Sequence, residues 1–99
     1  MSLLKTFNPT TGSLLAELEK TTSEQIDLIV KKSHQALPNW RRLSVRERGD
    51  CILKGYENIL AHRAEMEKLI HEEMGKTLTE AEREVSYYCG NLQNLIEEV

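Results

Sequence analysis

A run of apolar residues spaced for one helical face continues to the final position of this 99-residue sequence. Its members follow one another at intervals of four, three, four, three and four positions: Ala81, Val85, Tyr88, Leu92, Leu95 and Val99. This spacing places the six side chains, here called the apolar seam, on one face of a long amphipathic helix. A finished helix usually closes with Gly or Asn and carries cations in its last turn, whereas this one ends Glu97-Glu98-Val99. We therefore expect the helix, and the protein, to continue beyond this sequence.

The composition is that of one small soluble domain. Hydrophobic residues make up 39% of the chain, and 13 Lys and Arg face 16 Asp and Glu, for a net charge of -3. This balance gives no sign of a nucleic-acid partner, and no stretch approaches the roughly 20 apolar residues of a membrane span. The first residues also lack the pattern of a secretion signal. We expect a cytoplasmic protein with no membrane partner, in which Cys51 and Cys89 are free thiols.

Turn and capping signals predict a short β-hairpin followed by four helices. A Pro- and Gly-containing turn, Asn8-Pro9-Thr10-Thr11-Gly12, favours two strands within residues 4–19. Three helix starts carry Ser or Thr followed three positions later by Glu or Gln: Thr22 with Gln25, Ser44 with Glu47, and Thr79 with Glu82. The predicted helices cover residues 23–37, 45–60, 62–74 and 79–99.

A few residues predict where these helices end and which sides they bury. Pro38 disfavours helical geometry at Leu37, so we expect the first helix to end there and Trp40 to lie in the connection. Gly49 and Gly55 each cost the second helix about 1 kcal/mol relative to Ala and favour close packing there. Apolar spacing predicts two sets of inward-facing side chains: Val45, Ile52, Tyr56, Ile59 and Leu60 on the second helix, and Met66, Leu69 and Ile70 on the third.

No combination of residues has the spacing of a catalytic, cofactor-binding or metal site. The potential soft or imidazole metal ligands are His34, Cys51, His62, His71 and Cys89, and none of them pair at the spacing of zinc motifs. Both cysteines fall inside predicted helices, where we expect small packing residues rather than activated nucleophiles. Gly75-Lys76-Thr77 lacks the earlier glycine of a phosphate-binding loop, because position 70 is Ile. The many glutamates are best explained as a solvated helix face.

Several motifs, taken in order, resemble the beginning of an aldehyde dehydrogenase. They are Asn8-Pro9-Thr10-Thr11-Gly12, then Trp40-Arg41-Arg42-Leu43-Ser44 with Glu47-Arg48, then Glu73-Met74-Gly75-Lys76-Thr77, and finally Glu80-Ala81 with Glu84-Val85. The resemblance extends from about Phe7 to Cys89 and so covers nearly the whole chain. The form of the later motifs is most similar to the bacterial succinate-semialdehyde dehydrogenase branch.

The resemblance implies a full enzyme that oxidises an aldehyde, with succinate semialdehyde as the best candidate, to the carboxylic acid using NAD or NADP. Its fold would be α/β with a Rossmann-like coenzyme domain, of which residues 1–99 would form the N-terminal part. The partners implied are the remainder of the enzyme and further subunits of a homo-oligomer. The family's catalytic and coenzyme motifs do not occur here, so we expect this chain alone to be inactive. Family members often hold a monovalent cation near the last helix, and Glu84 is the residue that fits this metal role.

An independent helical interaction module is the alternative. Its fourth helix would use the segment Ala81–Val99 to dock a partner helix or a second copy of the chain. A module should fold reversibly by itself, whereas a fragment should expose apolar surface and self-associate. A gene remnant without present activity is a third alternative.

Overall fold

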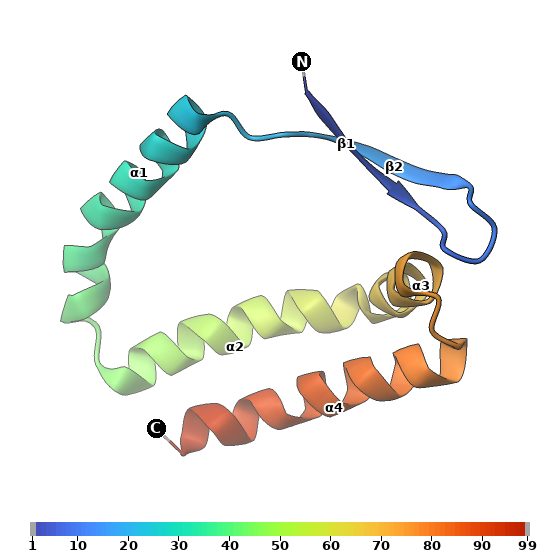
Figure 1. Ribbon diagram of the computed structural model, residues 1–99. Coiled ribbons are helices and arrows are strands. Elements are labelled where there is room, and N and C mark those ends of the chain that lie inside the picture. Colours follow the sequence, from blue (N-terminus) through green and yellow to red (C-terminus); the bar gives the residue numbers. More distant parts are fainter. Residues whose placement is uncertain (1, 99) are drawn as a thin grey trace.

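The computed structural model describes residues 2–98 and shows a two-stranded hairpin followed by four helices (Figure 1). In chain order the elements are β1 (Leu3–Phe7), β2 (Leu14–Glu19), α1 (Ser23–Arg42), α2 (Val45–Ala61), α3 (Arg63–Met74) and α4 (Leu78–Glu97). This confirms the predicted order of a hairpin and four helices. Of the described helices, none has both the length and the apolar run that crossing a membrane requires.

The hairpin is antiparallel and is closed by side-chain capping of its turn. Leu4 pairs with Leu18 and Thr6 with Ala16, and the register shifts between Thr6 and Phe7. The Asn8 side-chain oxygen accepts from the backbone N–H of Thr10 at 2.8 Å, which is the local bond that makes Asn a turn former. Both edges of this small sheet are open among the described residues.

The first helix is longer than predicted: it continues through Pro38 to Arg42. The pyrrolidine ring removes one helical N–H donor, yet the chain makes a further turn that contains Trp40. Two cations, Arg41 and Arg42, lie in this last turn, where they complement the negative end of the helix dipole. The helix ends at Arg42, and the N–H of the next residue, Leu43, donates to the Trp40 carbonyl. The predictions that α1 stops at residue 37 and that Trp40 lies in a loop are therefore wrong.

α2 and α4 lie side by side (Figure 1), and they approach each other closely at Gly49. A Cβ atom at this position would come within 2.9 Å of the Ile96 Cγ2 atom, so a larger residue would force the helices apart. Further along, the Tyr56 hydroxyl donates to the Cys89 carbonyl and ties α2 to the middle of α4. The predicted close packing is thus confirmed at Gly49, whereas Gly55 has open space beside it.

The apolar seam of α4 is only partly covered by the rest of the described chain. Ala81 and Val85 are buried, with 0% and 3% of their surface exposed. Tyr88 and Leu95 are instead 68% and 58% exposed, because α2 and α3 cover only one side of α4. Val99 lies outside the described residues. The expectation that the seam docks against another part of the enzyme or a partner stays a prediction, and within the described chain only Ala81 and Val85 are fully covered.

The inner sides predicted for α2 and α3 are only partly covered. Tyr56, Met66 and Ile70 are half-buried, as their spacing predicts. Most of the other predicted inner residues are exposed: Val45, Ile52, Ile59, Leu60 and Leu69. The correction has a simple cause, since the described residues supply too few elements to cover these faces.

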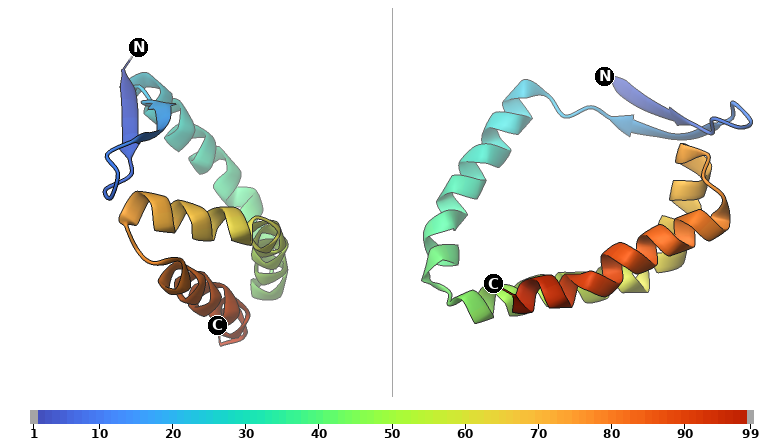
Figure 2. Two further views of the ribbon diagram at one scale, coloured as in Figure 1. Left: turned by 90° about the vertical axis from the view of Figure 1, so that its right-hand side faces the viewer. Right: turned by 60° about the horizontal axis from the view of Figure 1, so that its bottom comes forward.

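The described chain forms an open frame rather than a packed globule (Figure 2). Its accessible surface is 8210 Å², against about 5,800 Å² for a compact protein of this mass. The Cα radius of gyration is 17.7 Å, against about 13 Å for a domain of this length. No residue of α1 is buried, although Thr22 caps this helix through a complete capping box.

We expect Gly49→Ala and Gly55→Ala to have opposite effects on the free energy of unfolding. Gly55→Ala should stabilise the chain by up to about 1 kcal/mol, since Ala favours the helix and the site is open. Gly49→Ala should destabilise it by about 1 kcal/mol, because overpacking against Ile96 outweighs the same gain. Denaturant titrations of both variants followed by circular dichroism measure the difference. Equal stabilisation by both substitutions would contradict the close α2–α4 contact.

Candidate functional site

The connection between α3 and α4 is held by several polar contacts that fix its backbone. α3 ends at Gly75, which has a φ of 71° and donates its N–H to the His71 carbonyl at 3.2 Å. A Cβ atom on Gly75 would lie 3.1 Å from the Pro9 ring of the hairpin turn. Only glycine combines this left-handed backbone with so close an approach. Gly75 therefore marks the point where the hairpin, α3 and α4 meet.

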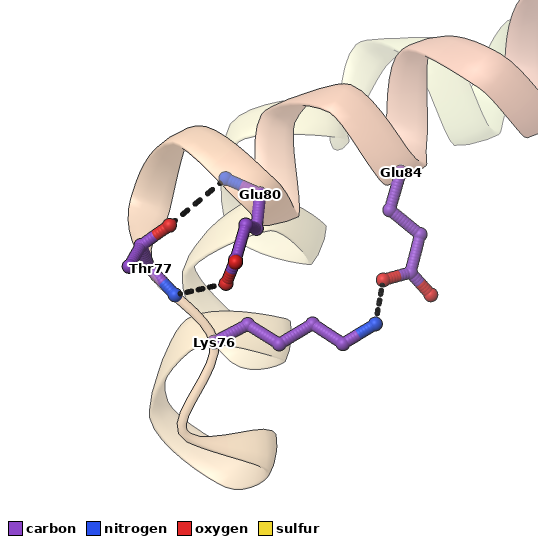
Figure 3. Close-up of polar contacts among 4 residues, drawn as sticks. All are labelled: Lys76, Thr77, Glu80 and Glu84. Atoms are coloured by element: carbon purple, nitrogen blue, oxygen red, sulfur yellow. Dashed lines mark hydrogen bonds and ion pairs between the residues drawn. The ribbon is translucent and has the colours of Figure 1, made fainter.

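Lys76 closes this connection with both its backbone and its side chain. Its carbonyl accepts from the His71 ring. Its ammonium group donates to the Glu84 carboxylate, almost two turns into α4 (Figure 3). The hydrogen bond to Glu84 raises the pKa of Lys76 above its usual value. Both side chains remain partly exposed, so this ion pair fixes geometry more than it adds stability.

α4 begins with a capping box formed by Thr77 and Glu80 (Figure 3). The Thr77 hydroxyl accepts from the Glu80 N–H at 3.2 Å, and the Glu80 carboxylate accepts from the Thr77 N–H at 3.0 Å. The predicted cap, Thr79 with Glu82, is therefore wrong by two positions. The segment Thr77-Leu78-Thr79-Glu80-Ala81-Glu82 contains two overlapping capping patterns, and the preceding Gly75 turn favours the first of them.

A second polar contact holds the start of α3 against α4. Arg63 donates to the Glu67 carboxylate at 2.7 Å and also to the hydroxyl of Ser86 on α4. The hydrogen bond to Glu67 raises the pKa of the Arg63 guanidinium, so this group stays a cation across the range of pH in which the protein exists. Sequence reasoning missed this contact, because Arg63 and Ser86 are 23 residues apart.

The residues considered for catalysis do not come together. Cys51 is exposed on α2, Cys89 is half-buried on α4, and both are free thiols. Within residues 2–98, no group of three or more His, Cys, Asp or Glu side chains is placed to hold a metal ion. The Glu84 carboxylate is paired with Lys76, so a cation there would have to compete with an ammonium group. The assignment of Glu84 as a monovalent-cation ligand stays a prediction.

The N-termini of α2 and α4 are poorly suited to bind a coenzyme phosphate. A pyrophosphate is held by unoccupied N–H groups at a helix N-terminus. In α2 and α4 one of these groups, the N–H of Glu47 or Glu80, already donates to the cap hydroxyl of Ser44 or Thr77, and the glutamate carboxylate itself lies at that end. Negative charge at these helix starts would repel a phosphate. We therefore assign no step of coenzyme chemistry to this part of the chain.

Large apolar side chains remain uncovered on several elements. On α4, the rings of Tyr87 and Tyr88 stack edge to face, with centroids 5.3 Å apart, and both rings are exposed. α1 exposes Ile26, Ile29 and Val30. A hollow of about 330 Å³ lies between α2 and the end of α4, and it is lined by Trp40, Val45, Arg48, Gly49, Ile52, Leu95 and Ile96. The surfaces that these residues offer are suited to packing against protein.

Comparison with known proteins identifies the family. The aldehyde dehydrogenase family model matches residues 2–99, so the chain belongs to the aldehyde dehydrogenase family. A mitochondrial succinate-semialdehyde dehydrogenase of Arabidopsis thaliana is 32% identical over 95 residues, which are 96% of this chain and 18% of that protein. A probable NADP(+) succinate-semialdehyde dehydrogenase of Sinorhizobium fredii is 35% identical over 92 residues, which are 93% of this chain and 19% of that protein.

A third relative has a different named substrate. A malonate-semialdehyde dehydrogenase of Lacticaseibacillus casei is 31% identical over 87 residues, which are 88% of this chain and 18% of that protein. The chain thus spans about a fifth of the length of the curated relatives it matches. No solved structure gives a significant match. The resemblance read from the turn and helix motifs is confirmed at the level of the family.

We expect Thr77→Ala to lower the free energy of unfolding by about 1 kcal/mol, because it removes the acceptor that caps α4. Thr79→Ala is the matched control: it lies inside the first turn, so replacement by a better helix former should be neutral or slightly stabilising. Denaturant unfolding of the two variants measures both effects. A larger loss for Thr79→Ala would show that the helix starts two residues later.

The Lys76–Glu84 ion pair makes the free energy of unfolding depend on pH in the alkaline range. Because folding raises the pKa of Lys76, its contribution to stability is complete below the ordinary lysine pKa and is lost as pH rises through the raised value. Glu84→Gln should lower the Lys76 pKa, as followed by NMR titration of the side-chain resonances. Glu73→Gln serves as the control and should leave the Lys76 pKa unchanged. An unchanged pKa in Glu84→Gln would rule out the ion pair.

Proposed function

We propose that this chain is the N-terminal part of an NAD(P)-dependent aldehyde dehydrogenase that oxidises a semialdehyde to the corresponding dicarboxylic acid. The observation that carries the proposal is the family match over residues 2–99. Succinate semialdehyde is the first candidate substrate, because that name belongs to relatives from a plant and from bacteria. Glutarate and malonate semialdehydes are the nearest alternatives. The succinate-semialdehyde dehydrogenases of Sinorhizobium fredii and Escherichia coli carry NADP(+) in their names, which supports NADP, and NAD is the alternative coenzyme.

In this proposal the described residues act as a scaffold within the coenzyme-binding domain. Their accessible surface exceeds that of a compact protein by roughly 2,400 Å², about three times what one partner buries in a standard interface. An area of this size suits a permanent contact with the rest of the same polypeptide. We also propose that the whole enzyme is a cytoplasmic homo-oligomer, and that residues 1–99 alone have no dehydrogenase activity.

A direct test compares two polypeptides. Sequencing of the DNA that follows the codon for Val99 defines the longer polypeptide, which is then purified beside the 99-residue chain. Reduction of NAD and of NADP is followed by absorbance with succinate, glutarate and malonate semialdehydes. Activity of the longer polypeptide alone, greatest with succinate semialdehyde, is the expected result. Activity of the 99-residue chain would overturn the scaffold role, and an inactive longer polypeptide would overturn the enzyme proposal.

A self-contained interaction module is the second candidate, and the exposed aromatic pair Tyr87 and Tyr88 favours it. In that function, part of the α4 surface would bind another helix or a second copy of the chain. The burial of Ala81 and Val85 limits such a surface to the outward side of α4.

Two substitutions in α4 should separate internal packing from external docking. Val85→Asp places a charge at a buried position, so it should cost several kcal/mol of stability. Leu95→Asp changes an exposed position and should leave unfolding of the isolated chain unchanged. Its effect should instead be weaker self-association, as measured by analytical ultracentrifugation. Unchanged association in Leu95→Asp would show that the outward side of α4 is not a docking surface.

A further inference from the structure

We draw no further inference here: the strongest candidate, the apolar hollow between the N-terminal half of α2 and the C-terminal end of α4, carries nothing because nothing in the structure shows what covers it.

Discussion

The packing of Ala81 and Val85 against α3 is the contact on which the rest of the described structure depends. These two side chains are the buried hydrophobic core of residues 2–98, and both belong to the first half of α4. The polar contacts around them serve the same junction, because Lys76 reaches Glu84 and Arg63 reaches Ser86. A small residue at position 81 lets the helices approach closely, and the hydrogen bonds fix their rotation.

Local sequence signals predict the hairpin and two of the three capping boxes correctly, but they fail at the third capping box and at the end of α1. Thr22 and Ser44 were identified as caps because a capping box involves only four consecutive residues. The continuation of α1 past Pro38 was missed, since the rule for the residue before proline is a preference that a helix can override. The sequence also does not predict which part of the apolar face of α4 is covered within the described chain. Six apolar positions at helical spacing define a stripe, but which part of it packs depends on where α2 and α3 lie.

The family motifs, including those of the candidate site, also act through local structure. The motif residues that identify the family prove to be the residues that shape the backbone. Asn8 caps the hairpin turn, Ser44 starts α2, and Gly75 with Thr77 makes the turn into α4. Each of them acts through a bond or a dihedral angle that few other residue types can supply. This explains how residues that shape the backbone carry a recognisable family signature.

The isolation of α1 has a consequence for how the protein opens. Most of the stability of a helix in a protein comes from tertiary packing, and α1 has no buried residue to supply it. Its amide hydrogens should therefore exchange with solvent deuterium far sooner than those around Val85, which open only when α3 and α4 separate. Within the described chain, α1 and the α3–α4 pair are thus two regions of unequal protection, and a protease would cleave first between the hairpin and α2.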